Sequence, residues 1–157
     1  MIAADLIRAV EAGRSPLLLN GRTEHLQYFA AKLDGAIKHV FVLKGGMGRK
    51  QRRNIAEALA SVPEHEPRVI LATGSYIEGF DDAHLDTLFL AMPISWKGTL
   101  QQYVGRLHRL HDNKRVVKVY DYVDDWVPVL ERMYERRMKG YGAIGYTIHR
   151  ESPAAVA

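Results

Sequence analysis

The sequence predicts an α/β fold with a mainly parallel sheet of five to six strands and helices on both faces. Short apolar runs alternate with amphipathic segments along most of the chain. The runs are continuously apolar rather than alternating, which is typical of strands buried on both faces. Alternation of such strands with helices is typical of a parallel sheet. Because no repeat or wide linker divides the chain, we expect one domain over residues 1–150 and a frayed tail over 151–157.

The individual elements follow from hydrophobic spacing and from glycine and proline breaks. Strands are expected at 17–19, 40–43, 69–72, 87–90 and 116–123. Helices are expected over 2–12, with Gly13 as a C-cap, over 25–33, from a basic loop to Ala60, and from residue 101 onward. A closing helix is expected over 126–138, with Val129, Leu130 and Met133 facing inward. Residues 140–146 are expected to be loosely ordered.

Composition narrows the class of protein. The 157 residues, 47% apolar and 25% charged, suit a globular domain with a real core. We expect no signal peptide and no membrane contact, since no apolar run approaches the roughly 18 residues of a membrane span. The absence of cysteine excludes disulfides and thiolate metal sites and is compatible with the cytoplasm, the location we expect. The histidines lack metal-ligand spacing, so no metal site is expected. A net charge of +4 favours a polyanionic partner such as nucleic acid.

Ligands of parallel α/β sheets bind beyond the carboxyl ends of the strands. Four polar stretches follow predicted strands and should meet at that edge: 20–24, 44–53, 73–81 and 93–102. The stretch 44–53 combines three glycines with five basic side chains, which suits phosphate contact. It is not a Walker A loop, because Lys50 is preceded by Arg49 and followed by Gln51. A solvated basic helix start is the alternative interpretation.

The stretch 101–109 reads Gln-Gln-Tyr-Val-Gly-Arg-Leu-His-Arg. Thr99 and Gln102 have capping-box spacing, so a helix should open here. On that helix Gln102, Arg106 and Arg109 share one face. Two guanidinium groups on one face suit a polyphosphate, because arginine is always charged and binds oxygens bidentately. The alternative is a surface helix whose arginines are solvated.

The pattern Gln102-x-x-Gly105-Arg106-x-x-Arg109 resembles motif VI of superfamily 2 helicases. The segment from Ala72-Thr73 to Gly79-Phe80-Asp81 resembles motif V, about 20 residues earlier. Residues 44–53 are similar to motif IVa, although Gln51 falls one position late, and Asn20 to Thr23 occupies the motif IV position. The resemblance extends from about Ser15 to Val123.

The resemblance implies a three-layer RecA-like (P-loop NTPase-like) fold, the C-terminal motor domain of a DEAD/DEAH-type helicase. Within the superfamily it is similar to type III restriction (Res-subunit-like) helicases. Arg106 and Arg109 would be the catalytic arginine fingers. The resemblance also implies a nucleotide-contacting set, Gly79, Asp81, Gln102 and Gly105, and a nucleic-acid-binding set, Asn20, Arg22, Gly46, Arg53 and Thr73.

The implied cofactor is ATP, shared with an N-terminal RecA-like domain that this sequence does not contain. That domain would hold most of the Mg²⁺ coordination and would be a partner together with DNA or RNA. Without Walker A or B motifs the chain alone is predicted to hydrolyse no ATP. A stand-alone nucleic-acid-binding module without ATPase activity and a purely structural adaptor remain alternatives.

Overall fold

The computed structural model describes residues 2–63, 65–73, 85–91, 104, 117–122 and 127–150. The chain forms two compact units. The first comprises residues 1–92 and 102–122, and the second comprises 93–101 and 123–157. Each unit is described by itself below. The single domain expected over 1–150, with a separate tail, stays a prediction.

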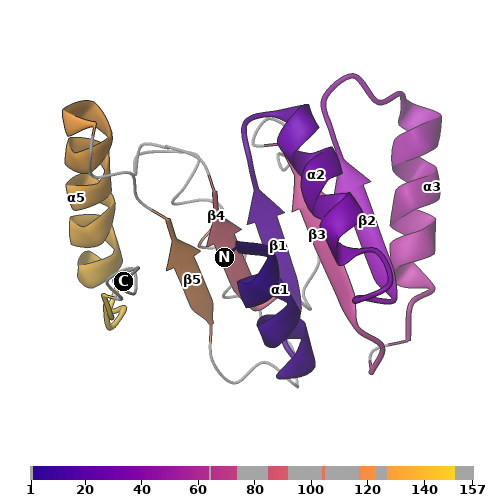
Figure 1. The fold of residues 1–157 in the computed structure, drawn as a ribbon, viewed down its shortest axis with the longest axis horizontal. Coiled ribbons are helices and arrows are strands. Elements are labelled where there is room, and N and C mark those ends of the chain that lie inside the picture. Colours follow the sequence, from indigo (N-terminus) through magenta and orange to yellow (C-terminus); the bar gives the residue numbers. More distant parts are fainter. Residues whose placement is uncertain are drawn as a thin grey trace, which may run out of the picture. The chain divides into compact units, whose positions relative to one another are not determined.

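The first unit contains a five-stranded, all-parallel sheet in the order β2-β3-β1-β4-β5 (Figure 1). Its strands are β1 (Pro16–Leu19), β2 (His39–Leu43), β3 (Arg68–Ala72), β4 (Thr87–Leu90) and β5 (Lys118–Asp121). The predicted parallel α/β class is therefore confirmed. The first four strands lie within one residue of their predicted bounds. The fifth is shorter than the predicted 116–123, although the Tyr122 N–H still donates to the Leu90 carbonyl at 3.3 Å.

Three helices of this unit are described: α1 (Ile2–Glu11), α2 (Thr23–Leu33) and α3 (Arg49–Ala60). α2 carries the chain from β1 past β3 to β2, and α3 returns it from β2 to β3. The two crossovers run in opposite directions, and parallel crossovers are nearly always right-handed. α2 and α3 therefore belong to opposite faces of the sheet, while α1 and α2 lie side by side on one face (Figure 1).

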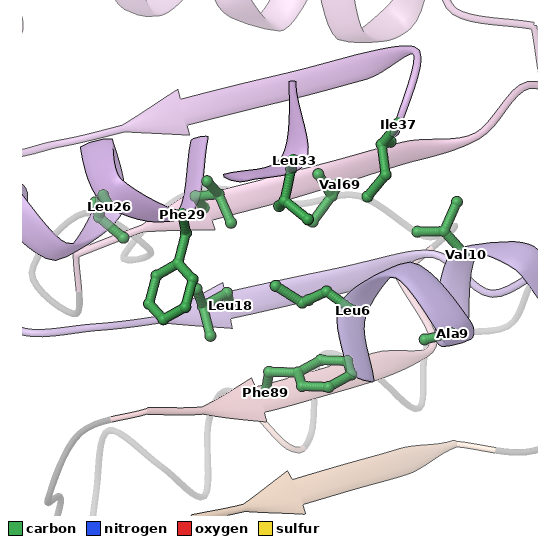
Figure 2. Close-up of a cluster of buried hydrophobic side chains, with 11 residues drawn as sticks. Leu6, Ala9, Val10, Leu18, Leu26, Phe29, Leu33, Ile37, Val69 and Phe89 are labelled. Carbon is green, nitrogen blue, oxygen red and sulfur yellow. The ribbon is translucent and has the colours of Figure 1, made fainter. Parts of the chain in front are cut away.

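A buried apolar cluster joins α1 and α2 to the sheet (Figure 2). Leu6 of α1 and Leu26 and Leu33 of α2 are fully buried against it. The sheet contributes Leu18, Val69, Leu71 and Phe89. Each such side chain contributes about 1.5–3 kcal/mol by leaving water. The opposite face is buried as well, since Leu19, Ile70 and Leu90 have no exposed surface, which is why these strands read as continuous apolar runs.

Gly13 ends α1 as expected. Its φ of 81° lies in the left-handed region, which only glycine adopts without strain. The Arg14 N–H donates to the Ala9 carbonyl and the Gly13 N–H to the Val10 carbonyl, each at 3.0 Å. This pair of bonds is a Schellman motif, which satisfies carbonyls at the helix end and turns the chain into β1.

In the second unit, α5 (Pro128–Ala143) begins with proline and continues beyond the predicted residue 138. The expectation of loose order over 140–146 was wrong. The Tyr146 N–H donates to the Tyr141 carbonyl at 3.0 Å, the Gly145 N–H donates to the Gly142 carbonyl at 3.1 Å, and Gly145 has φ 92°. These two bonds form a second Schellman motif. The rings of Tyr141 and Tyr146 lie 6.0 Å apart, and their contact offsets the roughly 1 kcal/mol that a glycine within a helix costs. Burial raises the pKa of Tyr146 to about 12.

The inward stripe of α5 also differs from its prediction. Leu130 and Met133 are partly buried, as expected, but Val129 is 53% exposed. The buried positions of this helix are Arg137, Gly140 and Tyr141. Val129 lies in the first turn at the margin of the stripe that these positions define, which is why it faces solvent. Of the helices described here, none has the length and apolar character needed to cross a membrane.

Candidate nucleic-acid interface at the carboxyl edge of the sheet

The residues that follow β3, β1 and β4 are held in one row by backbone hydrogen bonds. The Thr73 N–H donates to the Leu43 carbonyl at 3.0 Å, and the Asn20 N–H donates to the Ala72 carbonyl at 3.1 Å. The Ala91 N–H continues the row by donating to the Leu19 carbonyl at 2.9 Å. Asn20 and Thr73 therefore sit on adjacent strands, about 5 Å apart between backbones. Their side chains are fixed at the edge where parallel sheets bind ligands.

Asn20 is buried, with 6% of its surface exposed, and its side-chain amide is used within the protein. Its Nδ2 donates to the Ala91 carbonyl at 3.2 Å, and its Oδ1 accepts from the Arg22 N–H at 3.0 Å. The Oδ1 also lies 3.2 Å from Nδ1 of His25. Asn20 thus links the end of β1 to the end of β4 and to the start of α2. Its geometry suits a residue that positions this turn.

Thr73 is the second buried polar residue of the row, with 7% exposure. Its Oγ1 is buried and finds no hydrogen-bond partner among the described residues. A buried hydroxyl without a partner costs about 1–3 kcal/mol, so proteins seldom retain one without a use. Thr73 is one of the residues that the motif V resemblance assigns to a nucleic-acid phosphate.

The glycine-rich loop between β2 and α3 gives the edge its positive charge. Gly46 has φ 87°, which requires glycine, and a Cβ added there or at Gly48 would meet no atom within 4 Å. Among the described residues, the space beside this backbone on the side of a Cβ is therefore open. The N-cap of α3 is Gly48, which offers no side chain to cap the helix, and the first turn holds no acidic residue. The loop and first turns carry the partly buried Lys44 and four exposed basic residues: Arg49, Lys50, Arg52 and Arg53.

α2 begins at the same edge, after the three residues that follow the carboxyl end of β1. Its N-cap is Arg22, which is exposed and makes no side-chain capping bond. Two uncapped helix starts therefore point their N–H groups and positive dipole ends toward the carboxyl edge. Positive side chains beside such ends oppose the helix dipoles, and a bound anion would relieve that conflict.

The structure places the five residues predicted to bind nucleic acid, Asn20, Arg22, Gly46, Arg53 and Thr73, on this edge or on the loop and helix start above it. The residues assigned to the nucleotide lie outside the described residues: Gly79, Asp81, Gln102, Gly105, Arg106 and Arg109. Within the predicted helix at 101–109, Val104 is described; it is helical and 1% exposed. Among the described residues no cluster of three metal-ligating side chains occurs.

Sequence reasoning missed His25, which the structure joins to Asn20. Histidine spacing in a sequence points to metal sites alone, and a separation of five residues between Asn20 and His25 has no recognised meaning. The available signal was that both residues flank the predicted start of a helix after a buried strand.

No protein-family model matches the sequence, and no curated protein matches it. Solved structures do match. The C-terminal part of the Fun30 ATPase domain aligns with a TM-score of 0.67 at 16% identity, covering 87% of this chain and 44% of that one. UvsW of T4 aligns with a TM-score of 0.70 at 20% identity, covering 90% of this chain and 31% of that one.

Domain 2 of the DEAD-box helicase Mss116p, solved bound to an RNA duplex, aligns with a TM-score of 0.59 at 12% identity and covers 98% of this chain and 61% of that one. The fold is therefore the RecA-like fold that these helicase domains share, as the motif resemblance implied. The chain spans less than half the length of the Fun30 and UvsW structures. None of these matches bears on a likeness to type III restriction helicases, which stays a prediction.

Proposed function

We propose that this chain is the second motor domain of an ATP-dependent superfamily 2 helicase or translocase. In this proposal the described carboxyl edge is half of a nucleic-acid track. Asn20 shapes the track, while Arg22, Gly46, Arg53 and Thr73 contact phosphates of a DNA or RNA strand. The protein works in the cytoplasm together with an N-terminal RecA-like domain.

The observation that carries the proposal is the chemistry of this edge within a RecA-like fold. A buried hydroxyl without a described partner, two uncapped helix starts and exposed arginines converge there. Each of these groups donates hydrogen bonds or attracts negative charge. A phosphate backbone is a ligand that satisfies them together, because it presents regularly spaced anionic oxygens.

The described residue Val104 supports the proposed role of 101–109. In an α-helix, successive residues rotate by about 100° around the axis. A helix that presents Gln102, Arg106 and Arg109 on one face therefore turns Val104 to the opposite side, toward the core. Val104 is helical and almost fully buried, as that arrangement requires.

The proposed roles on the nucleotide side follow from the motif resemblance. Arg106 and Arg109 stabilise charge on the phosphoryl group of ATP held by the first domain. Asp81 and Gln102, with Gly79 and Gly105, couple the nucleotide to closure of the two domains. Mg²⁺ belongs mainly to the first domain, because this sequence has no Walker carboxylates.

Strand binding by the chain alone tests the track. The logarithm of the affinity for a single-stranded oligonucleotide is expected to fall linearly with the logarithm of salt concentration. Arg53→Ala is expected to reduce that slope by about 0.7, the single-strand value for one lost phosphate contact. A structural adaptor would bind no strand at any salt concentration, which would sink the proposal.

ATP turnover tests the motor. The chain alone is expected to hydrolyse no ATP. Joined to the N-terminal RecA-like domain of its parent protein, it is expected to support turnover that Arg109→Ala lowers by about 10³-fold or more, as loss of an arginine finger does elsewhere. A stand-alone binding module would bind strands equally well with or without Arg109 and would gain no ATPase activity from any first domain.

A further inference from the structure

The hydrogen bonds of Asn20 fix which way its amide points. The Ala91 carbonyl accepts a hydrogen bond, and the Arg22 N–H donates one. Only one amide orientation, Nδ2 toward Ala91 and Oδ1 toward Arg22, satisfies both; the flipped amide would oppose like groups at both ends. Asn20 therefore presents Oδ1, an acceptor, to the ring of His25 at 3.2 Å.

This orientation fixes the tautomer of His25. An acceptor facing Nδ1 requires Nδ1 to carry the hydrogen, so in the neutral ring the lone pair lies on Nε2. Nε2 has no hydrogen-bond partner among the described residues, and His25 is exposed at the start of α2. Protonation leaves the bond to Asn20 unchanged and converts Nε2 from an acceptor into a charged donor.

We propose that His25 is a phosphate-binding residue of the strand site that engages through Nε2–H in its protonated form, with Asn20 as the positioning residue. The proposal rests on the proposed function, since it adds a contact to the same track. It gives this site a dependence on pH: the strand binds more tightly as pH falls and the imidazole gains its proton. The phosphodiester remains anionic throughout that range.

The charged groups near His25 do not themselves account for a dependence of strand binding on pH, which favours the bound phosphate as its source. On its own segment the neighbouring charges are Arg22 and Glu24, both exposed and of opposite sign. From the sheet, the residues at the ends of β3, β1 and β4 are Thr73, Asn20 and Ala91, none of which titrates. On α1, which packs beside α2, Asp5 already accepts from Arg8 and from the Tyr122 hydroxyl. The dipole of α2 opposes a charged ring in the free protein, and a bound phosphate reverses that effect.

Strand binding measured against pH tests the proposal. Affinity for a single-stranded oligonucleotide is expected to rise about tenfold more for the unaltered chain than for His25→Gln between pH 8.0 and pH 5.5, the size of one charge-assisted hydrogen bond. The difference between the two profiles is the readout, because other histidines also titrate. His65→Gln is the matched control: His65 is exposed and precedes β3 at the opposite edge of the sheet, and its loss is expected to leave the profile unchanged.

Two results separate failure of this proposal from failure of the proposed function. If strands bind with the expected salt dependence and His25→Gln leaves the pH profile unaltered, the His25 contact is refuted while the track stands. A His25-dependent loss of affinity as pH falls also refutes it, because the neutral ring would then be accepting from a sugar hydroxyl or a base. If no strand binds at any pH, the proposed function is refuted, and the His25 contact is refuted as well because it belongs to the same site.

The ring tautomer gives a test that needs no ligand. Nitrogen NMR of the free chain at pH 8 is expected to show His25 as the Nδ1–H tautomer, assigned by its loss in His25→Gln. Observation of the Nε2–H tautomer overturns the proposal even if strands bind.

Discussion

The two edges of the parallel sheet treat their polar groups in opposite ways. At the amino edge, Asp86 accepts from the Ser15 N–H and the Thr87 hydroxyl, each at 2.9 Å, while the Thr87 hydroxyl accepts from Arg14 Nε at 2.6 Å. Glu66 at the same edge accepts from Lys38 and His39 at 2.7 and 2.6 Å. At the carboxyl edge, the Thr73 hydroxyl has no partner among the described residues, and the N-cap residues of α2 and α3 make no side-chain capping bond.

The difference separates stability from binding. Polar groups of the amino edge are satisfied by the chain itself, with Arg68 Nε as an exception among the described residues. At the carboxyl edge Asn20 is satisfied in the same way, but among the described residues the Thr73 hydroxyl has no partner and the N-caps of α2 and α3 make no side-chain capping bond. Substitutions at the amino edge should therefore change the free energy of unfolding and spare strand binding, and substitutions of Thr73 and of the exposed basic residues at the carboxyl edge should do the reverse.

The largest effect is expected for Asp86→Ala. This substitution removes the acceptor of two hydrogen bonds and leaves the Ser15 N–H and the Thr87 hydroxyl without their partner. Unfolding by urea is expected to show a loss of about 2–3 kcal/mol, since hydrogen bonds to a charged group are among the stronger ones. Asp86→Asn, which retains an acceptor, should lose less.

Strand affinity of Asp86→Ala, measured where the protein is fully folded, is expected to equal that of the unaltered chain. A loss of affinity without a loss of stability would break the division between the edges.

The division itself could be predicted only in part from the sequence. Continuous apolar runs such as Leu17–Leu19 and Val69–Ala72 predicted the buried parallel sheet, because burial on both faces leaves no room for polar alternation. Glycines at positions 46 and 48 and the basic residues after them marked the loop above the carboxyl edge. Periodicity could not show which polar side chains are satisfied, since the partners lie far apart in sequence: Arg14 and Thr87 meet only through the β1–β4 pairing. For the same reason the link between Asn20 and Ala91 was not foreseen.

The C-terminal helix shows a second limit of sequence reasoning. Gly140 and Gly142 predicted the end of order there because glycine weakens an isolated helix. The chain instead ends the helix in a Schellman motif at Gly145, and the contact between the rings of Tyr141 and Tyr146 outweighs the weakening by glycine. Local propensity alone does not register a ring contact made across a turn.

A matched pair of threonines sharpens the comparison. Thr87, fully buried at the amino edge, both accepts and donates a hydrogen bond, whereas the buried hydroxyl of Thr73 does neither among the described residues. Thr87→Val is therefore expected to destabilise the fold by about 1–2 kcal/mol and leave strand binding unchanged. Thr73→Val is expected to leave stability unchanged, because valine has the same shape and needs no partner, and to weaken strand binding several-fold.

Urea unfolding measures the stability of both variants, and an oligonucleotide titration measures their affinity for a strand. Equal destabilisation by the two substitutions would mean that Thr73 has a structural partner, and the carboxyl edge would then lose its most specific feature.

Smaller effects are expected for single basic residues of the carboxyl edge. Arg53→Ala removes one exposed guanidinium from α3, so strand affinity is expected to fall about fivefold, or roughly 1 kcal/mol, at low salt. Stability should be unchanged or slightly higher, because a positive charge is removed near the positive end of a helix. Lys38→Ala at the amino edge is the matched control, and it should have no effect on affinity. Equal losses from both would indicate attraction to net charge rather than a site.

The smallest effect is expected at Glu66 and depends on pH. Hydrogen bonds from Lys38 and then from His39 lower the pKa of Glu66 from 4.5 to about 2. Since the folded-state pKa lies below the unfolded one, the ionised carboxylate stabilises the fold above pH 4.5, and this contribution is lost as pH falls from 4.5 toward 2. The difference in unfolding free energy between the unaltered chain and Glu66→Gln should therefore be present at pH 5 and shrink as pH falls below it. Lys38 is 62% exposed, so the difference should be small and should shrink further in 1 M salt. A difference that stays constant down to pH 2 would mean that the charge of Glu66 does not stabilise the fold. The polar groups of the amino edge would then stabilise it through neutral hydrogen bonds alone.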